Sequence, residues 1–224
     1  LVGGNAYMVG LMQAHAEDLD AAASADQFAA TQQRALDQLQ REAVTLAIEQ
    51  AGLSDTHLIA IVSVAPRTGH KFPTGFPSRR AWLHVTVKDV AGDVVFESGA
   101  WTDEGRVVGD DHDADPAQYE PHHALIRDAD EVQIYEAVLG DVNGEVTNVL
   151  LRAAGYLKDN RLLPAGFDKA SAHVDTAVSG AAADDGNFLG GGDQVIYAIP
   201  LNGAEGPYTL DVELLYQTVS YNWA

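Results

Sequence analysis

His70 lies in the part of the chain whose residue types most strongly suggest a shaped binding loop. Residues 67–82 read RTGHKFPTGFPSRRAW, and the two glycines and two prolines of this run exclude both a helix and a central strand. The run separates two strand-like segments, residues 57–65 and 81–90. A loop held by rigid strands is a suitable place to display a ligand-binding imidazole. A structural crossover in which His70 bonds only to its own loop is the alternative.

His122 and His123 form a second candidate site for a cofactor or metal ion. They follow Pro121, and neighbouring residues of an extended segment point to opposite sides, so at most one of them would ligate a given centre. With His112 nearby, a surface zinc or nickel site is one interpretation, although the spacing does not make the imidazoles converge.

Asp111, Asp113 and Asp115 alternate in an acidic loop and supply the hard oxygen ligands that calcium prefers. The glycine that an EF-hand requires next is Pro116, and the position of its bidentate glutamate falls on His122. The pattern therefore excludes an EF-hand and leaves a looser calcium site, with a solvated acidic loop as the alternative.

We find no set of residues with the spacing of a known catalytic centre. The run Gly190–Gly192 lacks the strand-to-helix setting of a phosphate-binding loop, and no nucleophile elbow occurs. Asp184 and Asp185 sit in a glycine-rich stretch without the apolar surroundings that would raise a carboxyl pKa. The sequence predicts that the chain is not an enzyme.

The charge balance narrows the classes of partner. The chain has 33 acidic and 13 basic residues, which gives a net charge of −20. Such a surface repels nucleic acid and anionic membranes, and no apolar run approaches the roughly 20 residues of a membrane span. Docking to a basic partner and cation binding both suit this charge.

The elements that must position these residues fall into two parts. Residues 1–53 read as a helical segment, with one helix near residues 4–18 and a second, capped by Ser24, running from Gln27 to Gln50 and ending at Gly52. From His57 the apolar period changes to two, so residues 54–224 form the second domain.

About seven strands are expected in that second part. They cover residues 57–65, 81–90, 94–97, 132–139, 146–156, 194–201 and 208–217, with a short edge strand near residues 173–178. Leu83 and Val85 are expected to share the core with Val212 and Leu214. Strands joined by long loops without intervening helices predict a mainly β fold, an immunoglobulin-like antiparallel β-sandwich.

Several of these segments resemble one protein family. The run from Gly69 to Leu83, GHKFPTGFPSRRAWL, is similar to the C-terminal, haem-free domain of bacterial multihaem c-type cytochromes. Three later segments match that domain in the same order: residues 132–136 (VQIYE), 156–168 (YLKDNRLLPAGFD) and 214–217 (LLYQ). Residues 3–8 resemble the link that follows the last haem site in such proteins.

One departure from the family is large, because the chain has no cysteine and so cannot attach haem c through a Cys-x-x-Cys-His motif. The resemblance implies a region that supports electron transfer in the periplasm or outside the cell. It would pack on haems carried by another part of the same protein or by a cytochrome subunit, with His70 as a possible axial ligand and with possible self-assembly. Leu1 is no initiator, so we expect a mature or excised piece. A secreted β-sandwich module that binds calcium, carbohydrate or protein is the alternative function.

Overall fold

The computed structural model describes residues 2–224, with side chains from Ala6 onward. Leu1 and the side chains of residues 3–5, which belong to the predicted link, lie outside this part. The helices are α1 (Val2–Ala14), α2 (Ala25–Asp37) and α3 (Asp111–Ala114), with a π-helical turn η1 (Gln38–Glu42) after α2. The strands are β1 (Val44–Leu53), β2 (His57–Pro66), β3 (Arg80–Lys88), β4 (Val94–Ser98), β5 (Leu125–Ile126), β6 (Ile134–Tyr135), β7 (Ala137–Gly140), β8 (Gly155–Asp159), β9 (Asp193–Pro200) and β10 (Thr209–Gln217). Short 3₁₀ turns are η2 (Leu150–Arg152), η3 (Val174–Thr176), η4 (Ala181–Ala183) and η5 (Tyr221–Trp223).

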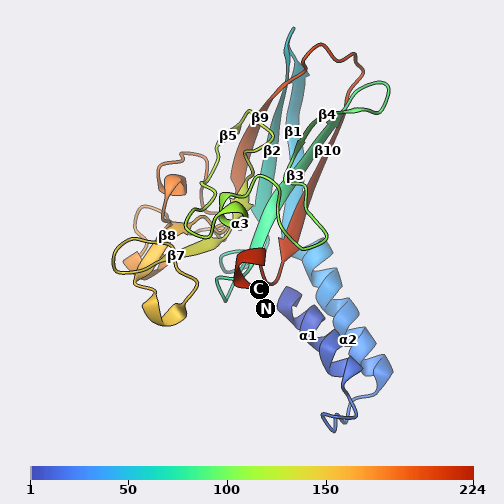
Figure 1. Cartoon of the computed structure of the whole chain (residues 1–224), viewed down its shortest axis with the longest axis vertical. Coiled ribbons are helices and arrows are strands. Elements are labelled where there is room, and N and C mark those ends of the chain that lie inside the picture. Colours follow the sequence, from blue (N-terminus) through green and yellow to red (C-terminus); the bar gives the residue numbers. More distant parts are fainter. Residues whose placement is uncertain (1) are drawn as a thin grey trace.

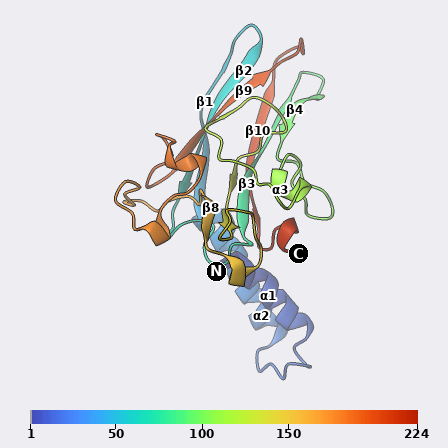
Figure 2. The ribbon, with the colours of Figure 1, turned by 60° about the vertical axis from the view of Figure 1, so that its left-hand side comes forward.

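Helices α1 and α2 form a hairpin that projects from one end of the sheets (Figures 1 and 2). The predicted capping box is confirmed: the Ser24 hydroxyl accepts from the Gln27 amide, and the Gln27 side chain accepts from the Ser24 amide. Phe28 and Ala35 are buried on the inner side of α2. Within the part of α1 whose side chains are described, Tyr7, Met8, Leu11 and Met12 remain exposed.

The second helix is shorter than predicted, and the boundary at residue 53 falls inside a sheet. Helical structure ends at Glu42, and Val44–Leu53 is strand β1, paired antiparallel with β2. Ala43, Leu46 and Ala47 fit a helical stripe, but Val44 and Leu46 also fit a strand of period two. The β-branched Val44, Thr45 and Ile48 favour the strand, and pairing with β2 satisfies its backbone groups.

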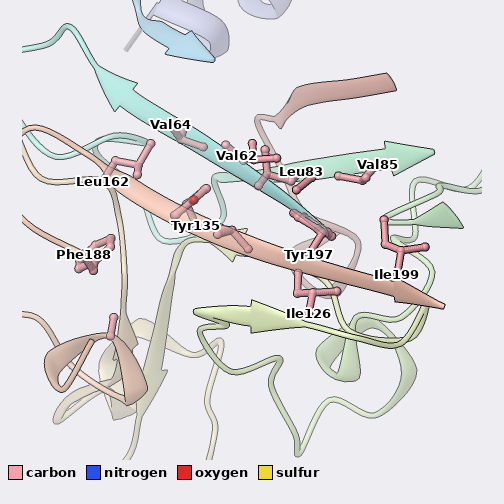
Figure 3. Close-up of a cluster of buried hydrophobic side chains, with 14 of the residues drawn as sticks. Val62, Val64, Leu83, Val85, Ile126, Tyr135, Leu162, Phe188, Tyr197 and Ile199 are labelled. Atoms are coloured by element: carbon pink, nitrogen blue, oxygen red, sulfur yellow. The ribbon is translucent and has the colours of Figure 1, made fainter. Parts of the chain in front are cut away.

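Two largely antiparallel sheets share one core, so the predicted fold class, mainly β after an N-terminal helical segment, is confirmed. One sheet has the order β1-β2-β9-β5, with β5 parallel to β9, and the other has β10-β3-β4 with β6 joining β3. Leu83 lies opposite Leu214 and Val85 opposite Val212 in the β3–β10 register, and all four pack in the shared core as predicted. Figure 3 shows Val62 and Val64 of β2 facing the core beside Tyr197 and Ile199 of β9.

The segments between residues 99 and 192 are less regular than predicted. The expected strand 132–139 is divided into β6 and β7 at Glu136, whose amide donates to the Asn160 side chain. Strand β7 pairs with β8, whereas residues 146–156 contain the turn η2, and the expected edge strand at 173–178 is the turn η3. Within residues 2–224, no helix combines the length and apolar content needed to cross a membrane.

Candidate functional site: an apolar groove with a histidine on its rim

His70 is exposed, and its own loop fixes the position of its ring proton. The ring Nδ1 lies 2.9 Å from the carbonyl oxygen of Lys71. Because a carbonyl oxygen only accepts, Nδ1 carries the proton and donates it. The neutral ring therefore keeps its lone pair on Nε2, which has no hydrogen-bond partner within the described part of the chain. A histidine held in this way presents the nitrogen that a metal ion binds.

The ring borders an apolar depression where the helical hairpin meets the two sheets. A groove of about 620 Å³ is lined by helix residues such as Leu36 and Leu39 and by strand residues such as Leu46, Leu214 and Tyr216. A smaller hollow of about 100 Å³ shares Leu39 and Tyr216 with it and is lined also by His70 and Arg79. We call the two hollows together the junction groove.

A buried ion-pair cluster anchors the His70 loop to the body of the domain. The Lys71 ammonium lies 2.7 Å from Asp159 Oδ2, and Arg161 donates to both oxygens of the same carboxylate at 2.8 Å. Asp159 is fully buried, and burial lowers the pKa of Lys71 against the attraction of Asp159. The cluster joins the segment around His70 to residues 156–168, two of the stretches that carry the family resemblance.

Arg80 holds another pair of those segments together. It is fully buried, and its guanidinium donates to Asp110 Oδ2 at 2.5 Å, to both oxygens of Asp113, and to the Gln217 side chain. Glu136 lies close to the same group and pairs with Lys158 at 3.0 Å. Burial, followed by the charge of Glu136, raises the pKa of Asp110 to about 8 despite Arg80.

Residues 132–136 contribute to a third buried network. The Gln133 amide donates to His122 Nδ1 at 2.8 Å and lies 3.3 Å from Asp193 Oδ2, which also accepts from the Tyr135 hydroxyl at 2.8 Å. Asn160 donates to the same His122 nitrogen and to the Ile134 carbonyl oxygen. The polar residues of the shared motifs thus bond partly to one another and partly to His122 and Asp193, which lie outside the motifs.

His122, Asp185 and Asp193 have the spacing of a metal site, since their ligand atoms lie within 4.8 Å of one another. Two amide groups donate to His122 Nδ1, so the ring proton is held on Nε2, which donates to Asp185 Oδ2 at 3.0 Å. Neither nitrogen then presents a free lone pair. The protonation pattern therefore opposes metal binding through His122.

The pKa values of this group follow from burial. Burial lowers the pKa of His122 to about 4, against the hydrogen bond to Asp185 that raises it. Burial raises the pKa of Asp193 to about 6, against the hydrogen bond from Tyr135. Asp193 Oδ1 and the Tyr197 hydroxyl are buried without a partner in the described chain. Burial therefore favours the neutral forms of both His122 and Asp193.

The other predicted ligands are dispersed. His123 bonds to Glu120 at 2.5 Å, apart from the contacts of His122, and both ring nitrogens of His112 are buried without a partner in the described chain. Asp113 is paired with Arg80, the Asp115 carboxylate accepts from the Ala117 amide, and Asp111 is exposed. Among the described residues, the ligand atoms of these three aspartates do not converge into a metal-sized group.

Comparison with known proteins gives one structural similarity. No protein-family model and no curated protein match the chain. Among solved structures, a penta-haem cytochrome c552 from Thermochromatium tepidum superposes with a TM-score of 0.47 at 18% sequence identity. The superposition covers 81% of this chain and 33% of the cytochrome chain, so this chain spans about a third of that protein's length.

Sequence reasoning assigned no role to Arg79, Arg80, Asp185 or Asp193. The arginines were visible as part of the family motif, but nothing local distinguishes a buried arginine from one that faces a groove. Asp193 follows three glycines and begins a strand, a position typical of a turn. The partners of these residues are more than 20 positions away for Arg80 and more than 50 for Asp193.

Proposed function

We propose that this chain is the haem-free region of a periplasmic or extracellular multihaem c-type cytochrome. In this proposal the junction groove covers the edge of one haem, carried by the rest of that protein or by a cytochrome subunit. The motif resemblance of residues 69–83, 132–136, 156–168 and 214–217 supports the family. The geometry of His70 is the observation that carries the assignment of the groove.

His70 meets the requirements of an axial ligand in three respects. Its Nδ1 proton is bound by the Lys71 carbonyl oxygen, so Nε2 is free to bind iron. The ring is exposed, and it lies beside apolar side chains that would pack on a flat macrocycle. Its loop is tied to the core by Lys71 and Asp159, which limits the movement of the imidazole.

In this proposal the chain binds the haem, orients it and shields its edge from water. The redox centre would be a haem attached to another part of the protein or to a cytochrome subunit, because this chain contains no cysteine to attach one. The apolar lining excludes water from the haem edge, and both water exclusion and an added nitrogen ligand change a haem potential. In this proposal the chain catalyses no reaction of its own.

A titration with a haem c peptide tests the assignment. The peptide carries one axial histidine and an open sixth position, and binding of an imidazole converts its spectrum from high-spin to low-spin. We expect the intact 224-residue chain to produce the low-spin spectrum and His70→Ala to abolish it. His173→Ala removes another exposed histidine and serves as the matched control. A spectrum that stays high-spin, or that responds equally to both variants, would overturn the proposal.

A further inference from the structure

The helical hairpin carries an apolar surface that is open to solvent. Helix α1 contains no charged residue, although 21% of the chain is charged. Met8, Leu11 and Met12 of this helix are between 42% and 49% exposed. The hairpin projects beyond the sheets, so the rest of the described chain leaves much of it uncovered (Figures 1 and 2). An exposed apolar surface of this kind is typical of a protein–protein interface.

The two helices of the hairpin together form a groove on this surface. It has a volume of about 620 Å³ and is lined by Val9 and Met12 of α1 and by Asp26, Ala30 and Arg34 of α2. The three α2 residues follow one another at intervals of four, so they form one row along the helix. We call this hollow the outer groove.

The outer groove and the junction groove lie on opposite sides of the hairpin. Ala30 and Arg34 line the outer groove, whereas Gln32 and Leu36 line the junction groove. Because an α-helix has 3.6 residues per turn, positions two apart point about 160° away from each other. A partner in the outer groove therefore leaves the junction groove free.

The charges beside the outer groove indicate what fills it. Asp26 and Arg34 are exposed, and neither takes part in an ion pair within the described part of the chain, whereas Asp37 of the same helix pairs with Arg41. The two charged residues are separated by about 12 Å at 1.5 Å per residue, with Ala30 midway between them.

A second copy of the same helix matches this spacing. If the copy is related by a two-fold axis at Ala30, it runs antiparallel, and each Asp26 lies opposite the Arg34 of the other copy. The small side chain of Ala30 lets the two helices approach closely at the axis. A parallel copy would place like charges opposite each other, so the charges favour the antiparallel arrangement alone.

We propose that two copies of this chain associate through their outer grooves, hairpin on hairpin, as an antiparallel four-helix arrangement with two-fold symmetry. Each hairpin offers roughly 400 Å², the area of two helices about 10 Å wide and about 20 Å long. This area is at the small end for a specific interface, so the dimer is weak and its population depends on concentration. The net charge of −20 on each copy opposes association, and salt reduces that repulsion.

Sedimentation equilibrium of the intact chain tests the proposal, over concentrations from about 10 μM to about 1 mM. We expect the weight-average mass to rise toward twice that of the monomer. Asp26→Arg and Arg34→Asp each make both intermolecular pairs like-charged, so each should raise the dissociation constant about 10-fold or more. Asp55→Arg makes the same change of charge in the exposed turn after β1 and is the matched control, with unchanged association.

Restoration of the charge pairs identifies the antiparallel register. The double variant Asp26→Arg/Arg34→Asp should associate like wild type, and an equimolar mixture of the two single variants should form a heterodimer. His70→Ala should leave association unchanged, because His70 lines the junction groove, so the test is separate from that of the proposed function.

Three results would overturn the proposal. A wild-type mass that stays monomeric at every concentration would assign the outer groove to a different partner. Equal association of wild type and both single variants would place the contact elsewhere on the molecule. A double variant that keeps the wild-type circular dichroism spectrum but stays monomeric would exclude the pairing of Asp26 with Arg34.

Discussion

At the scale of single residues, the polar side chains of the shared motifs bond partly to one another and partly to buried residues outside the motifs. Lys71 pairs with Asp159, Arg80 with Gln217, and Gln133 with His122. A buried charge that loses its partner destabilises a protein strongly, so these residues contribute to the stability of the fold whether or not a ligand binds. His70 and Arg79 differ from them, because each keeps nitrogen atoms without a hydrogen-bond partner in the described chain and both line the smaller hollow of the junction groove.

Removal of the Asp159 carboxylate should be costly. Asp159→Asn leaves Lys71 and Arg161 close together without a counter-charge, and we expect the free energy of unfolding to fall by about 3–5 kcal/mol. Urea denaturation followed by circular dichroism measures this change. Asp175→Asn, at an exposed position, is the control and should leave the urea midpoint unchanged. A midpoint for Asp159→Asn equal to that of wild type would show that the pair contributes nothing.

The pH dependence of stability should contain two opposing contributions from the His122 network. Asp193 has a folded pKa of about 6 against 3.8, so the folded state binds the extra proton and stability falls as pH rises between these values. His122 has a folded pKa of about 4 against 6.5, so the unfolded state binds the extra proton and stability increases over pH 4 to 6.5. The two contributions nearly offset each other in the wild type.

Replacing either His122 or Asp193 should therefore reveal the pH dependence of stability that the other residue contributes. Between pH 4.5 and 6, His122→Gln should change the slope of unfolding free energy against pH in the negative direction, by up to about 1.4 kcal/mol per pH unit. Asp193→Asn should change it in the positive direction. Urea unfolding at three pH values measures both slopes, and changes of the same sign relative to the wild-type slope would contradict the assigned pKa shifts.

At the scale of elements, sequence periodicity predicted the regular strands and failed where two periods overlap. Strand β3 alternates between apolar and polar residues from Leu83 to Lys88, so the inward face of this part was predictable, and Leu83 and Val85 lie opposite Leu214 and Val212 of β10. Residues 43–47 satisfy both a helical and a strand pattern, and β-branched side chains together with pairing to β2 decide for the strand. The partners of His122 and Asp193 come from several segments, so no local pattern could have revealed them.

Truncation of core side chains in β3 and in β10 should lower the free energy of unfolding by different amounts. Leu83 is fully buried, so Leu83→Ala should lower the free energy of unfolding by about 2–5 kcal/mol. Leu214 packs on the same core but also lines the junction groove, and Leu214→Ala should cost less because that side chain is only partly buried. Chemical denaturation of both variants shows which one loses more stability. A larger loss for Leu214→Ala would mean that the groove is closed in solution.

At the scale of the whole molecule, the observed start of β1 moves the useful boundary from residue 53 to Ala43. A fragment of residues 44–224 keeps β1 paired with β2, and we expect cooperative thermal unfolding. A fragment of residues 54–224 loses that strand and exposes the edge of β2, so it should melt at a lower temperature or aggregate. Circular dichroism melts and light scattering compare the two. Equal melting temperatures would show that β1 adds no stability to the sandwich.

The arrangement of the lysines has a practical consequence for chemistry on the intact protein. The sequence has four lysines: the Lys71 and Lys158 amines are held in ion pairs, and the Lys169 amine donates to two carbonyl oxygens. Lys88, at the far end of β3 from the junction groove, is the remaining one, roughly 26 Å from Arg80 at 3.3 Å per residue. Mild acylation of side-chain amines should therefore modify Lys88 first. If the protein is attached to a solid support through the Lys88 amine, every molecule has the same orientation, with the junction groove facing the solution.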